Sequence, residues 1–144
     1  MIYYIRHGES LANINQYTHW AMLDPPLTEK GKLQCFETKQ KLKSIHFDII
    51  ICSPLKRSIQ SACLLFPNRI VYCFPEVSEI GFGLDNFSNY EPFGFPQVII
   101  MKETLMTFIK NNNNKTIAII SHEHYIESKT NKKLNNMEFI WEML

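Results

Sequence analysis

The sequence predicts an α/β fold in which helices cover both faces of a mostly parallel sheet, a three-layer α/β/α sandwich. Short apolar runs rich in Val and Ile are typical of strands that are buried on both faces. These runs alternate along the chain with segments whose apolar residues recur at helical spacing. Strands that alternate with helices favour a parallel sheet. At 144 residues, the chain is long enough for one such domain, and we expect residues 1–144 to form it.

The first half of the chain supplies three of the expected strands. Thr28 is a suitable N-cap for a helix that runs to Leu42, and the Ser53–Pro54 pair ends an apolar β-branched run. We therefore expect strands at Met1–Ile5, Phe47–Cys52 and Ile70–Phe74, and helices from Thr28 to Leu42 and from Ser58 to Phe66.

The second half begins with a segment rich in Gly, Pro, Asn and aromatic residues, Phe82–Pro96, which has no periodicity and is typical of a loop. Val98–Lys110 carries apolar residues near one helical face and is predicted to be a helix. Asn111–Asn114 indicates a solvated loop. Thr116–Ser121 then predicts a fourth strand, and the alternating segment Glu138–Met143 predicts a fifth at the edge of the sheet.

Composition excludes several classes of partner. Fifteen basic and fourteen acidic residues give a net charge of +1, so there is no overall positive field for nucleic acid or an anionic membrane. The apolar runs are far shorter than a membrane span, and the N-terminus has no pattern of a secretory signal. The four cysteines show no Cys-x-x-Cys pair, so we expect reduced thiols and a cytoplasmic location.

Polar side chains follow three of the expected strands at the point where each strand ends. Arg6 and His7 follow the first, the segment from Ser53 to Arg57 follows the second, and His122 follows the fourth. Ligands of such folds bind at the carboxyl ends of the strands. Because arginine offers a planar fork of N–H donors that matches phosphate oxygens, the pattern indicates an anion site.

Several ordered motifs resemble the histidine phosphatase superfamily, the phosphoglycerate mutase-like proteins. The resemblance covers residues 1 to about 126 and rests on the segments Ile5–Ser10 with Asn13, Asp24–Gly31, Ser53–Ala62, Val77–Gly83 and Ile119–His122. A single Arg-His-Gly would be a weak signal, whereas this ordered series is specific.

The resemblance implies a role for each polar residue at the strand ends. His7 would attack phosphorus through one neutral ring nitrogen and form a phosphohistidine, while its other nitrogen donates to a fixed acceptor, most simply a backbone carbonyl. Arg6, Arg57 and His122 would hold the phosphate oxygens. Asn13 is either a further neutral donor to phosphate or only a helix-terminal residue.

Glu79 is the candidate general acid for the leaving group in this resemblance. Such a carboxyl must hold its proton near neutral pH, and apolar neighbours such as Ile80, Phe82 and Phe87 favour the protonated form by desolvation. Glu76 lies close in sequence and is the alternative acid.

One residue departs from the pattern: Glu123 directly follows His122, where members of the family usually have glycine. A carboxylate beside the phosphate site would repel a dianion and reduce activity if it points inward. This departure keeps open a second interpretation, a catalytically weak or inactive module of the same fold that binds phosphorylated ligands.

The main prediction is a metal-independent phosphomonoesterase that needs no cofactor and acts on a small phosphorylated substrate. A phosphoglycerate mutase-type phosphotransferase is a further alternative, but it needs extra cations, and the sequence has no Lys or Arg between Glu79 and Val98. That stretch instead offers an aromatic rim, Phe82, Phe87, Tyr90, Phe93 and Phe95. A metallohydrolase would have to use His7, Asp24, His122 and His124, whose spacing matches no compact ligand motif.

Overall fold

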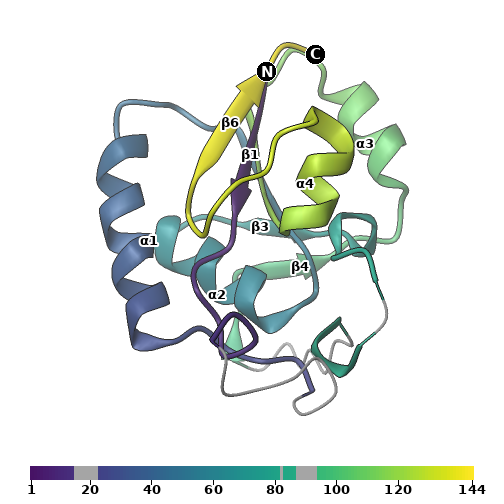
Figure 1. The fold of residues 1–144 in the computed structure, drawn as a ribbon. Helices are drawn as coiled ribbons and strands as arrows, with labels where there is room; N and C mark the ends of the chain where they lie inside the picture. Colours follow the sequence, from purple (N-terminus) through teal and green to yellow (C-terminus); the bar gives the residue numbers. More distant parts are fainter. Residues whose placement is uncertain (15–22, 82, 87–93) are drawn as a thin grey trace.

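A six-stranded sheet forms the centre of the protein in the computed structural model, which describes residues 1–14, 23–81, 83–86 and 94–144. The strand order is β4-β3-β2-β5-β1-β6 (Figure 1). The strands are β1 (Ile2–Arg6), β2 (Ile49–Cys52), β3 (Val71–Cys73), β4 (Val98–Ile100), β5 (Ile117–Ser121) and β6 (Phe139–Glu142). Only the β1–β6 pair is antiparallel among the pairs in this sheet, so the predicted mostly parallel sheet and the edge strand are confirmed.

Helices cover both faces of this sheet. They are α1 (Glu29–Leu42), α2 (Lys56–Leu65), α3 (Leu105–Asn111) and α4 (Glu123–Thr130). The buried side chains form two clusters, one with α1 and α2 and the other with α3 and α4. Neighbouring residues of β2 divide between them, Ile50 in the first and Ile51 in the second, because successive side chains of a strand point to opposite faces. The three-layer architecture is therefore confirmed.

A close contact between two glycines ties the turn after β1 to the start of α1. Thr28 caps α1 as predicted, and its hydroxyl oxygen accepts the N–H of Gly31 at 3.0 Å. A Cβ atom placed on Gly31 would lie 2.1 Å from the carbonyl oxygen of Glu9, and one on Gly8 would lie 2.7 Å from the carbonyl oxygen of Gly31. Only glycine fits here, and the contact fixes the backbone immediately after His7.

The prediction of one helix over Val98–Lys110 was wrong. Val98–Ile100 is strand β4, which pairs in parallel with β3, and the helix begins only at Leu105. The reason is local: the β-branched run suits an edge strand, and Thr104 starts a new helix by accepting the N–H of Thr107 at 3.2 Å.

Helix α4 follows His122 and was not predicted. It is short and buries only Tyr125 and Ile126, so its periodic signal is weak. Its end does carry a signal, because Asn131 adopts a left-handed conformation with φ 57°, as asparagine often does after a helix. The placement of α4 matters for the site, since its first residues border the cavity described below.

The expected loop Phe82–Pro96 lies mostly outside the described residues. Its described part contains a short 3-10 helix, η2 (Leu84–Asn86), and Phe95 packs against the core. The other aromatics of the predicted rim, Phe82, Phe87, Tyr90 and Phe93, lie outside the described residues.

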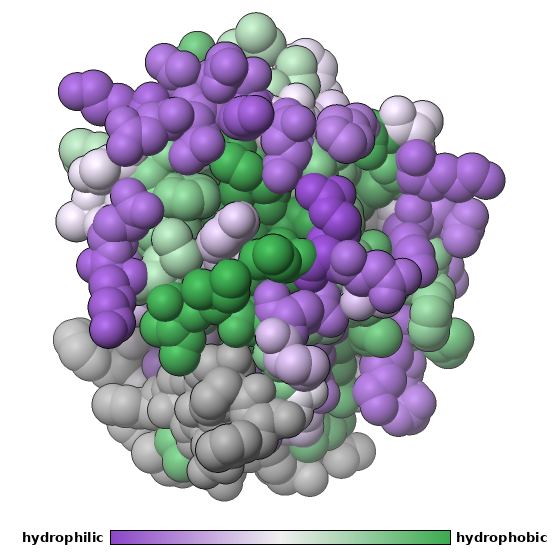
Figure 2. Space-filling view, turned by 180° about the vertical axis from the view of Figure 1, so that it is seen from behind, coloured by the Kyte–Doolittle hydropathy of each residue, from purple (hydrophilic) through white to green (hydrophobic). Residues whose placement is uncertain are grey.

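The back of the molecule carries an apolar surface where β4 forms the edge of the sheet. Ile99 and Ile100 are 44% and 51% exposed, and Figure 2 shows apolar side chains gathered at the centre of this face. None of the helices in the described residues has the length and apolar character that crossing a membrane requires.

Candidate active site

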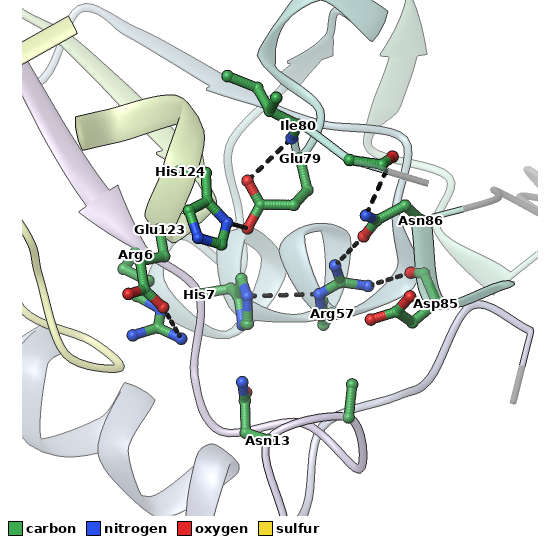
Figure 3. Close-up of a pocket in the computed structure, with 12 residues that line it drawn as sticks. Arg6, His7, Asn13, Arg57, Glu79, Ile80, Asp85, Asn86, Glu123 and His124 are labelled. Carbon is green, nitrogen blue, oxygen red and sulfur yellow. Dashed lines mark hydrogen bonds and ion pairs between the residues drawn. The ribbon is translucent and has the colours of Figure 1, made fainter. Parts of the chain in front are cut away.

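A cavity of about 260 Å³ lies at the carboxyl end of β1, beside the start of α2 and of α4. Strands β2, β5 and β1 are neighbours in the sheet, so the polar residues that follow them meet at one edge, as the sequence predicts. Five of the predicted site residues line the cavity together (Figure 3). They are Arg6, His7, Asn13, Arg57 and Glu79.

His7 is held in a single orientation beside Arg57. Its Nδ1 lies 2.6 Å from the carbonyl oxygen of Gly8, an acceptor only, so Nδ1 carries the proton and donates it. Nε2 therefore has a lone pair, and the Nε–H of Arg57 points at it from 3.3 Å. Burial, followed by the charge of Arg57, holds the pKa of His7 well below its ordinary value. The result is a neutral imidazole whose unprotonated Nε2 is held in one position.

Arg57 lies in the first turn of α2 and is almost fully buried. Its guanidinium also donates to the carbonyl oxygen of Asp85 at 2.6 Å and to the amide oxygen of Asn86 at 3.0 Å. These residues of η2 were not identified from the sequence, because they belong to no motif. They hold the two amino groups of the guanidinium, while its Nε–H is directed at Nε2 of His7.

Arg6 is paired with Glu123 rather than left open to the cavity. Its guanidinium lies 3.1 Å from Oε2 of Glu123 and donates to the carbonyl oxygen of Leu134 at 2.8 Å. Oε1 of Glu123 lies 3.4 Å from Nζ of Lys133. Glu123 lines the cavity, so the residue that departs from the family pattern points inward.

His122 lies beside His7 but does not line the cavity. The two rings are 5.0 Å apart between centroids, and His122 is fully buried. Its Nε2 is 2.7 Å from the hydroxyl oxygen of Ser53, while Nδ1 has no hydrogen-bond partner in the described part of the chain. Burial, and then the charge of Arg57, hold the pKa of His122 well below its ordinary value.

Asn13 turns its amide nitrogen toward the cavity (Figure 3). Its oxygen accepts the backbone N–H of Ser10 at 3.0 Å, the hydroxyl of Ser10 at 3.2 Å and the amide of Asn136 at 3.3 Å. These donors fix which end of the side chain is oxygen, so the NH₂ group remains for a ligand.

Glu79 lies in a polar setting, not the apolar one that the sequence suggests. Its Oε1 accepts the N–H of Ile80 at 2.9 Å and the N–H of Tyr125 at 3.3 Å. Its Oε2 lies 3.4 Å from Nδ1 of His124. Of the apolar neighbours that the sequence suggests, Ile80 is 55% exposed, and Phe82 and Phe87 lie outside the described residues. The described contacts of Glu79 are therefore polar and do not provide the expected desolvation.

The alternative acid lies outside the cavity, and the residues of the alternative metal site are not grouped in the described part of the chain. Glu76 does not line this cavity; its carboxylate accepts the N–H of Leu105 at 2.7 Å, where α3 begins. Asp24 accepts the N–H of Lys56 at 2.7 Å. Within the described ranges, no three residues of the His, Cys, Asp and Glu types are grouped as a metal ion requires.

Comparison with known proteins places the chain in a family. Residues 2–87 match the histidine phosphatase superfamily (branch 1). Adenosylcobalamin/alpha-ribazole phosphatase of Escherichia coli (strain K12) is 36% identical over 85 residues, which cover 57% of this chain and 41% of that protein. A 2,3-bisphosphoglycerate-dependent phosphoglycerate mutase of Bartonella henselae is 43% identical over 61 residues, which cover 40% and 29%. The matched segments thus span less than half the length of these curated relatives.

Among solved structures, a phosphoserine phosphatase variant from Entamoeba histolytica, in complex with phosphoserine, superposes with a TM-score of 0.70 at 25% identity. The superposition covers 96% of this chain and 87% of that one. The strand order, the residues at the strand ends and the match over residues 2–87 agree, and the chain belongs to the histidine phosphatase superfamily.

Proposed function

We propose that the protein is a phosphomonoesterase that moves the phosphoryl group of a small monoester first to Nε2 of His7 and then to water. The observation that carries the proposal is the orientation of His7, whose Nδ1 donates to Gly8 and whose Nε2 keeps its lone pair at the cavity. Nucleophilic catalysis requires such an unprotonated nitrogen in a fixed position.

The phosphate oxygens have several donors around them. Arg57 would exchange its contacts with Asp85 and Asn86 for phosphate oxygens, and the amide NH₂ of Asn13 already faces the cavity. We also assign a donor role to Nδ1 of His122, which has no partner among the described residues, although His122 itself does not line the cavity. Phosphoryl transfer depends mainly on such positioned charge and hydrogen bonds.

Glu79 is the proposed acid. As His7 Nε2 bonds to phosphorus, the bond to the leaving oxygen breaks and that oxygen takes a proton from Glu79. Water then attacks the phosphohistidine, the phosphorus–nitrogen bond breaks, and the proton of the water returns to the carboxylate. No metal or cofactor enters this sequence of steps.

The cavity favours a small substrate. A volume of about 260 Å³ accommodates a phosphate group with a short organic part. The names of similar phosphatases contain phosphoserine and alpha-ribazole, which supports a small phosphorylated compound as the substrate. A mutase needs further cations for a second anionic group, and the stretch between Glu79 and Val98 has no Lys or Arg. We also propose that residues 1–144 act as one domain and that the protein works in the cytoplasm.

The second candidate function is the weak or inactive module that binds phosphorylated ligands. The pairing of Glu123 with Arg6 at 3.1 Å favours it, because the carboxylate occupies a guanidinium that would otherwise meet the phosphate. The two functions differ in a single property, turnover.

The test is hydrolysis of p-nitrophenyl phosphate by the purified protein, with and without EDTA. We expect turnover that EDTA does not change, and a loss of at least about 1,000-fold in His7→Asn. His46→Asn is the matched control, because the His46 side chain is 85% exposed and lies outside the cavity. Phosphate binding without turnover would favour the module, and activity that EDTA removes and a divalent metal restores would favour a metallohydrolase.

A further inference from the structure

We infer that His124 is the proton partner of Glu79: its imidazole stores the proton that Glu79 delivers to the leaving group. The inference rests on the proposed function and concerns a residue outside the motifs of the family resemblance. It starts from the 3.4 Å between Nδ1 of His124 and Oε2 of Glu79 inside the cavity (Figure 3).

The two oxygens of Glu79 have different surroundings. Two backbone N–H groups, those of Ile80 and Tyr125, donate to Oε1. A protonated oxygen would place a hydrogen against these donors, so the transferable proton belongs on Oε2. His124 is the side chain that the structure pairs with this oxygen.

His124 also connects the carboxyl group with solvent. The side chain of Glu79 is 12% exposed, whereas that of His124 is 59% exposed and stands in the first turn of α4. Histidine is the side chain whose ordinary titration lies nearest neutral pH. The imidazole of His124 therefore gives the pair a second position for a proton, and this position is open to solvent.

Over one turnover the pair loses one proton and regains one proton. At the start the pair holds one proton, which can reside on Nδ1 of His124 or on Oε2 of Glu79. Oε2 gives it to the leaving oxygen as the phosphorus–oxygen bond breaks and His7 takes the phosphoryl group. The attacking water returns one proton to Oε2 as the phosphorus–nitrogen bond breaks, and the pair is restored.

Other charged or titratable groups of the described residues line the same cavity. Their effect on the pH profile must be distinguished from the effect of the pair. These groups are Arg6, His7, Arg57, Asp85 and Glu123. The arginines do not titrate in the accessible range, and burial keeps the pKa of His7 well below its ordinary value. The carboxylates of Asp85 and Glu123 are still present when only His124 is replaced. A difference between the pH profiles of His124→Asn and wild type is therefore assigned to the pair.

The experiment compares an alkyl phosphate with p-nitrophenyl phosphate across pH 5 to 9 in the whole chain. An alkoxide needs a proton as it leaves, and nitrophenolate needs little. In His124→Asn we expect kcat/KM on the alkyl phosphate to fall about tenfold or more, and to fall further at pH 8 than at pH 5.5. We expect kcat/KM on p-nitrophenyl phosphate and the affinity for inorganic phosphate to change little. Added imidazole should restore turnover of the alkyl phosphate. His46→Asn is the matched exposed-histidine control.

A double variant separates a proton partner from a structural contact. If His124 acts through Glu79, His124→Asn causes no further loss on the alkyl phosphate in a Glu79→Gln background. Parallel pH profiles of His124→Asn and wild type, or additive losses in the double variant, would overturn the inference. Those results leave the proposed phosphatase intact if the wild type still turns over, whereas absence of any turnover contradicts the proposed function itself.

Discussion

The residues of the cavity divide into those that the proposed phosphoryl transfer uses and one that opposes it. His7, Arg57 and Asn13 have their bonding groups oriented toward the same space. Glu123 instead puts a carboxylate into that space and pairs with Arg6 and Lys133. Because family members usually have glycine at this position, we interpret Glu123 as the residue that sets how strongly Arg6 engages phosphate.

Replacing Glu123 is expected to strengthen phosphate recognition. In Glu123→Gln the negative charge is removed, so the guanidinium of Arg6 is available and the repulsion of a dianion is relieved. A charge-assisted hydrogen bond contributes about 1.5–3 kcal/mol, so kcat/KM on small phosphomonoesters should rise about tenfold or more. Glu127→Gln is the matched control, since it removes the same charge from the same helix outside the cavity. Unchanged or lower kcat/KM in Glu123→Gln would mean that the carboxylate helps to hold Arg6 or the substrate.

At the scale of elements, the turn between β1 and α1 does most to position His7, the proposed nucleophile. Gly8 and Gly31 let the backbone after His7 meet the first turn of α1, and Ser61 of α2 accepts the N–H of Gly8 at 3.0 Å. The two motifs that contain these glycines are therefore in contact in the fold, although 23 positions separate the glycines in the sequence.

Gly31→Ala is expected to lower the free energy of unfolding by about 1–3 kcal/mol, because the new methyl group would overlap the carbonyl of Glu9. Urea unfolding measures this loss. Gly94→Ala is the control, since a Cβ atom there meets nothing within 4 Å. A Gly31→Ala protein as stable as Gly94→Ala would show that the contact is not tight.

The elements also show what the sequence could predict. The strand ends carried motifs, so Arg6, His7 and Arg57 were found, and their meeting followed from the parallel sheet. Helix α4 and strand β4 were missed, because a short helix with few buried residues and a three-residue strand leave little periodic signal. Asp85, Asn86 and the polar contacts of Glu79 depend on how loops fold back on the sheet, which local patterns do not encode.

At the scale of the whole molecule, two buried neutral histidines of the site also affect the stability of the fold. His7 and His122 lie at the ends of adjacent strands, and burial lowers the pKa of both well below the ordinary value. The unfolded chain exposes them to water and restores their ordinary pKa, about 6.5. Below that pH the unfolded state binds more protons than the folded state, so stability is complete above about pH 6.5 and falls as the pH decreases.

We expect the free energy of unfolding to fall between pH 7.5 and 5.5, by at most about 1.4 kcal/mol for each of these histidines. Urea unfolding in buffers without phosphate measures it. In His7→Gln the decrease should be about half as large, and in the exposed control His46→Gln it should be unchanged. A flat profile over this range in the wild type would contradict the buried neutral state.

The central claim is a covalent phosphohistidine at His7, and trapping it is the most direct test. The purified protein is mixed with a monoester labelled in its phosphoryl group, quenched within milliseconds, and digested for peptide mapping. We predict a label on the peptide that contains His7, stable to base and lost in acid, which forms at least as fast as product. His7→Asn should carry no label and His46→Asn should carry the wild-type amount. Turnover at the wild-type rate in His7→Asn, or turnover without any label on the His7 peptide, would contradict the claim.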